Sequence, residues 1–287
     1  MSLPDEVRAH CAQVAATARS VTIDHAALEA IEVQPRATIE PPLEGTAEEA
    51  ARSLLILDTI NFGSGWFPTL RKRSGHSGYQ TVAATLREHF AREGLWSNAQ
   101  LTAMDTRSVS VAVGQDPDNE LMALYAQALR DLGRWLGPRT ALEAIAAAGG
   151  SAATLSAQLA AGMALYADAG FYKRAQIVPA NLALAGVADF SDLDELTIFA
   201  DNLVPHVLRC EGVLDYDPRL AAHIDAGRLL RPGRQEQEIR ACAVHACELL
   251  AARTAIPPRL LDNELWNRGQ QPQYKAKPRH RCRCVYY

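Results

Sequence analysis

The chain has 287 residues, 48% of them hydrophobic, and a formal net charge of −4. This length predicts one large or two small domains, and the apolar share excludes a disordered chain. The slightly negative charge argues against a general nucleic-acid-binding protein or a binder of anionic membranes. No early basic segment precedes an apolar run, and no run reaches the ~18 apolar residues of a membrane span. We therefore expect a cytoplasmic protein without a membrane partner.

Helical patterns dominate the chain. Residues 1–19 have the spacing of an amphipathic helix, and Asp24 is a suitable N-cap for a second helix over 25–31. The prolines of residues 33–44 predict a connector, because proline cannot continue a helix. Further helices are expected in segments bounded by Gly, Pro or a capping residue, namely from Thr46 towards Asn61, 79–92, 118–136, 140–148 and 152–164.

Only residues 20–23 and 281–286 have the alternating pattern of a strand. The sequence therefore predicts a mainly α protein, a single compact helical domain with at most short β segments. Within it we distinguish N-terminal helices and a connector (1–45) from a helical catalytic body with a docked C-terminal tail (46–287).

The cysteines do not indicate a metal centre. The chain has six, with no C-x-x-C pair, and Cys282 and Cys284 are too close together to form a site alone. On the helix expected around residues 238–250, Cys242 and Cys247 point to different faces, so a zinc site there is improbable. We expect free thiols and no metal.

The segment 196–208, LTIFADNLVPHVL, holds one acid, Asp201, four residues before Pro205. Because proline lacks an N–H, a helix through this segment loses a backbone bond and should kink or restart. A carboxylate at an apolar helix break is costly unless it is paired or used. Two interpretations stay open at this point: Asp201 caps the following turn, or it takes part in chemistry.

A second acid lies in the stretch IPPRLLDNELWNRG, where Pro257 and Pro258 suit a helix start and Gly269 a helix end. Asp262 and Trp266 then share one helix face. An acid beside an aromatic ring suits recognition of a flat base that carries hydrogen-bond donors. The alternative is an exposed helical acid and a core tryptophan.

Several stretches together carry a resemblance to a known family. TIFADNLVPHVLRCEGVLDYDPRL is similar to the signature of the queuosine salvage family, and further matches follow in the same order, namely DTINFGSGW, SGYQTVAATL, FYKRAQI, EQEIRACAVHACEL, LDNELW and PRHRCRCVYY. The resemblance covers about residue 20 to the end of the chain.

The resemblance implies an N-glycosidase that hydrolyses queuosine 5′-phosphate to queuine and ribose 5-phosphate, for queuine salvage and tRNA modification. It implies a fold like that of helical DNA glycosylases, a small-molecule nucleotide as partner and no cofactor. By residue-to-residue match, Asp201 is the catalytic carboxylate and Phe199 contacts the base. Positions expected to line the base pocket are Asp262, Asn263, Trp266 and Asn267. The family usually has Tyr at position 263 and Asp at 267, so base preference stays open.

Further candidates for substrate binding are Lys173, Arg174, Asn181 and His280. Lys173 and Arg174 suit a phosphate, although such a pair is also typical of a solvated face. Asn181 stands where the family commonly has Asp. His280 belongs to the basic, aromatic tail, whose alternating pattern predicts docking against the body.

Two other functions remain possible from the sequence. One is a glycosidase for a different modified nucleotide, and the other is a non-catalytic protein that binds modified bases. A glycosylase acting on duplex DNA would share the need for a carboxylate, but the negative net charge disfavours direct nucleic-acid binding.

Overall fold

The computed structural model of the chain describes residues 1–34 and 45–287, so the connector expected at 33–44 lies almost wholly outside the described residues. The α-helices are α1 (Leu3–Ala16), α2 (His25–Ala30), α3 (Ala47–Thr59), α4 (Gly78–Glu93), α5 (Asn98–Thr102), α6 (Thr106–Ala112), α7 (Glu120–Leu136), α8 (Ala141–Ala146), α9 (Ala152–Gly162), α10 (Lys173–Leu184), α11 (Val204–Cys210), α12 (Pro218–Asp225), α13 (Arg234–Thr254), α14 (Pro258–Arg268) and α15 (Pro272–Lys275). Short 3₁₀ turns are η1 (Phe67–Thr69), η2 (Ala164–Tyr166) and η3 (Leu193–Glu195). The prediction of a mainly helical protein is confirmed. Of the helices within the described residues, none is long and apolar enough to span a bilayer.

Side-chain caps explain where several helices begin. The Thr46 hydroxyl accepts from the Glu49 N–H, and the Glu49 carboxylate accepts from the Thr46 N–H, which satisfies two N–H groups at the start of α3. Ser77 and Gln80 make the same reciprocal pair at α4. The predicted starts at Asp24 and Thr46 are therefore confirmed.

The β structure is small. Strands β1 (Val21–Ile23) and β2 (Leu214–Tyr216) pair antiparallel, with Val21 opposite Tyr216. The predicted strand at 20–23 is thus confirmed. The strand predicted at 281–286 is wrong, because that segment makes only one isolated bridge, between Cys282 and Leu230. The Cys284 N–H donates to the Cys282 carbonyl within the segment, and the Val285 carbonyl accepts from the Arg174 side chain, so neither group takes part in a sheet.

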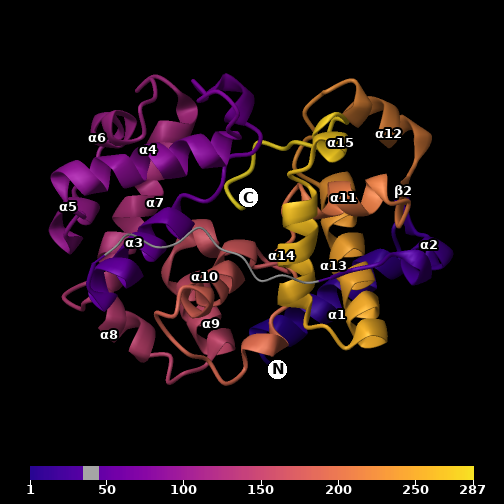
Figure 1. Cartoon of the computed structure of the whole chain (residues 1–287), viewed down its shortest axis with the longest axis horizontal. Helices are drawn as coiled ribbons and strands as arrows, with labels where there is room; N and C mark the ends of the chain where they lie inside the picture. The colour runs from indigo at the N-terminus through magenta and orange to yellow at the C-terminus, as the bar shows by residue number, and fades with distance from the viewer. Residues whose placement is uncertain (35–44) are drawn as a thin grey trace.

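The helices pack around two main hydrophobic cores. The first is formed by helices α3 to α10, and the second by α1, α2, the small sheet and α11 to α15. Figure 1 shows α4 to α8 on one side and α11 to α15 on the other, with the C-terminus between them. Helix α1 lies along α13, where Arg8 Nε donates to Glu248 Oε2 at 2.9 Å. The N-terminal helices therefore share a core with the C-terminal half, and the division at residue 45 stays a prediction.

One buried arginine connects these parts. Arg240 of α13 binds Asp168 through two hydrogen bonds of 2.5 and 3.1 Å, and it donates to the Ala200 carbonyl at 2.9 Å. Its guanidinium also lies over the rings of Phe171 and Tyr287, at 4.0 and 4.8 Å from their centroids. Arg240 thus ties together the loop before α10, the backbone beside Asp201 and the end of the chain.

The C-terminal tail is docked, as the sequence predicts. Tyr287 is buried, and its carbonyl oxygen accepts from the Gly63 N–H at 2.9 Å. The Val285 carbonyl accepts from Arg174 at 2.8 Å. These partners belong to the loop after α3 and to the start of α10, so the tail joins elements of the first core.

Removing Val285–Tyr287 is expected to destabilise the protein by at least ~2 kcal/mol, the contribution of one fully buried aromatic side chain. The loss also removes an acceptor from Arg174 and an aromatic face from Arg240. Thermal unfolding of the truncated protein measures this effect, and Arg283→Gln, an exposed change in the same tail, is the matched control. Equal melting temperatures for the truncated and full-length proteins would contradict the docked tail.

Candidate active site

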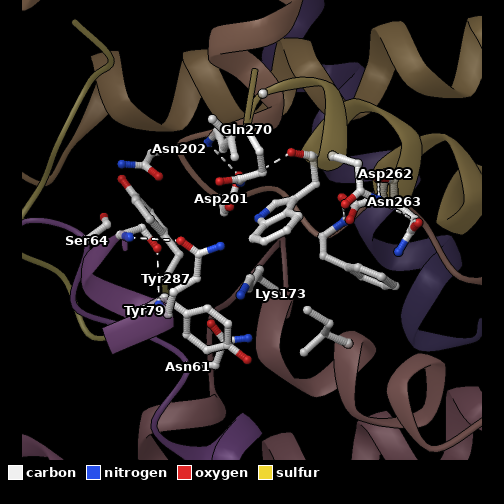
Figure 2. Close-up of a pocket in the computed structure, with 18 of the residues that line it drawn as sticks. Asn61, Ser64, Tyr79, Lys173, Asp201, Asn202, Asp262, Asn263, Gln270 and Tyr287 are labelled. Carbon is white, nitrogen blue, oxygen red and sulfur yellow. Dashed lines mark hydrogen bonds between the residues drawn. The ribbon is translucent and has the colours of Figure 1, made fainter. Parts of the chain in front are cut away.

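A cavity of about 860 Å³ lies between the two cores. Its wall is built from α3 and the loop after it, the start of α4, α10, the segment 199–206, α14 and the tail. Its volume is typical of a small-molecule site. Figure 2 shows polar side chains from all these elements converging on the cavity.

Asp201 lies in an irregular segment before α11, not inside a kinked helix. Its Oδ1 accepts from the backbone N–H groups of Leu203 and Val204, at 2.6 and 3.1 Å. Pro205 falls in the first turn of α11, where its missing N–H leaves no bond unmade. The expectation of a helix restart is met, and the capping interpretation holds for one oxygen. The two hydrogen bonds to Oδ1 fix the carboxylate in place at the cavity wall. Oδ2 accepts no hydrogen bond from any described residue, so it is available to a ligand in the cavity.

Asp262 and Phe199 are joined directly. Asp262 Oδ1 accepts from the Phe199 N–H at 2.8 Å, and both residues are buried and line the cavity. Burial raises the pKa of Asp262 well above its usual range, and the charge of Asp201 adds to that shift. Asp262 in its neutral form can donate a hydrogen bond as well as accept one. Figure 2 shows Asp201 and Asp262 as separate polar groups within one cavity.

Three other residues of α14 line the same part of the cavity. Trp266 contributes a half-buried indole, as the sequence predicts for a wall of the pocket. Asn267 Nδ2 donates to the carbonyl and the Oδ1 of Asn263, at 2.8 and 3.0 Å. The two asparagines therefore present a linked pair of neutral amides where the family usually has Tyr and Asp.

Lys173 and Arg174 have different surroundings although they are adjacent. Lys173 is buried at the start of α10 and lines the cavity, and the charges of Asp201, Asp58 and Asp262 act on its ammonium group. Figure 2 shows its side chain in the middle of the cavity. Burial lowers the pKa of Lys173, and the three acids oppose that shift.

Arg174 does not line the cavity. It is buried, and its guanidinium donates to the backbone carbonyls of Thr59, Leu165 and Val285. It also lies over the Phe62 and Tyr166 rings. We correct its expected role from a phosphate ligand to a structural one, because it lies outside the cavity wall and its two terminal nitrogens hold loops and the tail.

His280 is also outside the cavity wall. Burial lowers the pKa of His280 to about 3, so its ring is neutral. Its carbonyl accepts from Asn202 Nδ2 at 3.1 Å, and its ring packs edge-on against Tyr287. Since Asn202 and Tyr287 both line the cavity, His280 supports the wall from behind and does not reach the substrate space.

Asn181 lines the cavity and binds a second buried acid. Its Nδ2 donates to both carboxylate oxygens of Asp58, at 2.8 and 3.1 Å. Burial raises the pKa of Asp58 from 3.8 to about 7, and the Asn181 hydrogen bond opposes this shift. Sequence reasoning missed Asp58 as a site residue, although an acid in an otherwise apolar stretch of α3 is a detectable signal.

Other cavity residues were also missed as site candidates, namely Asn61, Ser64, Tyr79, Asn202, Gln270, Arg279 and Tyr287. Except for Tyr79 in the first turn of α4, they come from loops and the tail, whose position depends on tertiary packing. Within the described residues, no group of three or more His, Cys, Asp or Glu side chains is arranged to hold a metal ion.

The Asp58→Asn variant is expected to gain stability relative to the wild type as pH rises from about 4 to 7. The folded protein holds the Asp58 proton up to pH ~7 but the unfolded chain releases it near pH 3.8, so the carboxyl makes folding less favourable across this window. The largest difference is roughly 4 kcal/mol, and the curve is flat above pH 7. Chemical denaturation of both proteins between pH 4 and 8 measures it. A pH-independent difference would show that Asp58 titrates normally.

Comparisons with known proteins identify the family of the chain. The family described as queuosine salvage protein matches residues 42–287. A Sphaerobacter thermophilus protein named queuosine 5′-phosphate N-glycosylase/hydrolase is 32% identical over 96% of this chain and 95% of its own length. Proteins of the same name from Mus musculus and Dictyostelium discoideum are 37% and 36% identical, each over 41% of this chain and 40% of the relative. The family match and the nearly full-length bacterial relative show that this chain belongs to the queuosine salvage protein family.

Proposed function

We propose that this protein hydrolyses the N-glycosidic bond of queuosine 5′-phosphate, releasing queuine and ribose 5-phosphate for queuine salvage. Family membership supports the substrate, because the similar proteins carry that activity in their names. The observation that carries the chemistry is the carboxylate of Asp201, whose Oδ1 is fixed by two backbone N–H groups at the wall of a cavity.

The reaction needs a negative group near the sugar. As the bond between C1′ and the base nitrogen breaks, its electron pair leaves with the base and positive charge develops on the sugar. Asp201 stabilises that charge without moving, because its backbone hydrogen bonds already orient it. A water adds its oxygen to C1′, and its proton balances the negative charge left on the departing base.

The base is proposed to lie between Trp266 and Phe199. Both aromatic side chains line the cavity, and the Phe199 backbone is anchored by Asp262. A planar purine-like base gains stacking energy from such rings. Asp262, Asn263 and Asn267 then provide hydrogen-bonding groups at its edge. Lys173 limits the repulsion among the cavity acids.

We place the reaction in the cytoplasm. All six cysteines are free thiols, and Cys11, Cys242, Cys247 and Cys282 are buried in the fold. Disulfides are rare in reducing compartments, so a fold that contains only free thiols suits such a compartment.

A direct test is incubation of the purified protein with queuosine 5′-phosphate, queuosine and guanosine 5′-phosphate, followed by mass spectrometry of the freed bases. Release of queuine from queuosine 5′-phosphate is expected, and guanosine 5′-phosphate is the matched nucleotide control. Release of a base from another nucleotide only would assign a different substrate. Binding without any release would identify a non-catalytic binding protein.

Asp201→Asn is expected to lower kcat on the order of 100- to 1000-fold, because one positioned charge-stabilising group is lost. The asparagine oxygen can still accept from the Leu203 and Val204 N–H groups, so the fold and base binding should persist. Single-turnover kinetics and a binding titration separate the two effects. Turnover near the wild-type rate in a folded variant would exclude Asp201 as the catalytic group.

Trp266→Ala is expected to weaken substrate binding roughly tenfold or more, since base stacking contributes about 1–3 kcal/mol. Trp266→Phe keeps an aromatic face and should lose much less. The KM values of the three proteins, with their melting temperatures as a folding check, provide the comparison. Equal KM values for Trp266→Ala and the wild type would place the base elsewhere in the cavity.

A further inference from the structure

The cavity contains an arginine that forms no ion pair with any acid in the part of the chain that the structure describes. Arg279 belongs to the tail between α15 and Tyr287, and it lines the cavity with a partly buried side chain. Its guanidinium has no hydrogen bond or ion pair with any residue that the structure describes. Burial lowers the pKa of Arg279, and only Asp201 among the described acids opposes the shift. Even a partly buried guanidinium loses solvation that a partner should replace, so an unpaired one on a cavity wall indicates a site for an anion.

Two other arginines show the contacts that a structural arginine makes in this fold. Arg259, which also lines the cavity, pairs with Asp194 at 2.6 Å. Arg174 is buried but donates to three backbone carbonyls. Arg279 has neither kind of partner, so its place in the cavity is not explained by the packing of the fold.

The surroundings of Arg279 add positive charge on the same side. Lys275 and Lys277 precede it in the tail, are exposed and line the same cavity. The base pocket on α14 instead carries a carboxyl group and two amides, at Asp262, Asn263 and Asn267. The cavity therefore has one cationic side, formed by the tail, and one neutral or acidic side, formed by α14.

We propose that Arg279, assisted by Lys277, binds the 5′-phosphate of the substrate and makes the enzyme prefer nucleotides to nucleosides. The proposal rests on the proposed function, because it uses a ribose held above Asp201. The negative charge of Asp201 raises the pKa of Arg279, in opposition to the effect of burial. Asp201 and Arg279 line the same cavity, so a ribose bound over Asp201 can extend its 5′ substituent toward the tail side of that cavity. Guanidinium groups bind phosphate oxygens through paired, charge-assisted hydrogen bonds.

The test compares kcat/KM for queuosine 5′-phosphate and for queuosine. The wild type is expected to favour the nucleotide, and Arg279→Gln should reduce that ratio on the order of 10- to 100-fold, as for loss of a hydrogen bond to a charged group. Arg279→Lys keeps the charge without the paired geometry and should give an intermediate ratio. Arg283→Gln, an exposed arginine of the same tail, should leave the ratio unchanged.

Three results would overturn the assignment. One is a wild-type enzyme that does not discriminate between nucleotide and nucleoside. Another is an Arg279→Gln enzyme that loses both activities equally and keeps the ratio, since that is the behaviour of a structural residue. The third is loss of discrimination in Arg87→Gln and not in Arg279→Gln, which would place the phosphate at the α4 side of the cavity.

A second readout does not depend on hydrolysis of a queuosine nucleotide. Ribose 5-phosphate is expected to raise the melting temperature of the wild type at concentrations where ribose does not. The shift should be lost in Arg279→Gln and kept in Arg283→Gln. If the wild type hydrolyses neither queuosine compound but shows this shift, the proposed function fails and the phosphate site stands. An equal shift in Arg279→Gln and the wild type would remove the phosphate site alone.

Discussion

The buried pair of Arg240 and Asp168 is the interaction on which the site depends most. Arg240 comes from α13 in the second core, whereas Asp168 precedes α10, which packs in the first. Although burial lowers it, Asp168 holds the pKa of Arg240 above its usual value, so the guanidinium stays charged. Breaking such a pair by removing one partner typically costs about 3–5 kcal/mol. The same arginine holds the Ala200 carbonyl, one residue before Asp201, so the geometry of the candidate catalytic carboxylate is coupled to the joining of the cores.

The tail extends this coupling. The Tyr287 ring packs against the Arg240 guanidinium, and the Tyr287 carbonyl oxygen accepts a hydrogen bond from the Gly63 N–H. Both Tyr287 and the loop after α3 contribute to the cavity wall. The tail also carries Arg279 into the cavity. This short tail therefore stabilises the junction between the two cores and also places the Arg279 guanidinium on the wall of the cavity. Chain ends are ordinarily frayed unless they are tied down, and here the binding of several buried groups keeps the end in place.

The sequence predicts the helices well because their signals are local. Caps such as Thr46 and the apolar spacing of α3 and α7 require no knowledge of distant residues. The site was predicted in part: Asp201, Asp262 and Trp266 do lie on one cavity, since each stands in a distinctive motif on a single element. Arg174 and Arg279 could not be ranked correctly from sequence. Both are arginines in basic, aromatic stretches. Only the tertiary contacts show that the guanidinium of Arg174 has partners, whereas that of Arg279 has none within residues 1–34 and 45–287.

Neutral amide side chains form hydrogen bonds in the cavity at positions where additional acids would repel Asp58, Asp201 and Asp262. Asn181 donates to both oxygens of Asp58 with one nitrogen. An aspartate at position 181, as the family commonly has, would face another carboxyl group, and two adjacent carboxyls can avoid repulsion only by sharing a proton. Asparagine makes the same contact without that proton. Asn267 likewise binds Asn263 as a neutral partner. These neutral amides therefore add hydrogen bonds to the cavity without adding negative charge, which fits our proposal that Asp201 is the carboxylate that stabilises the sugar cation.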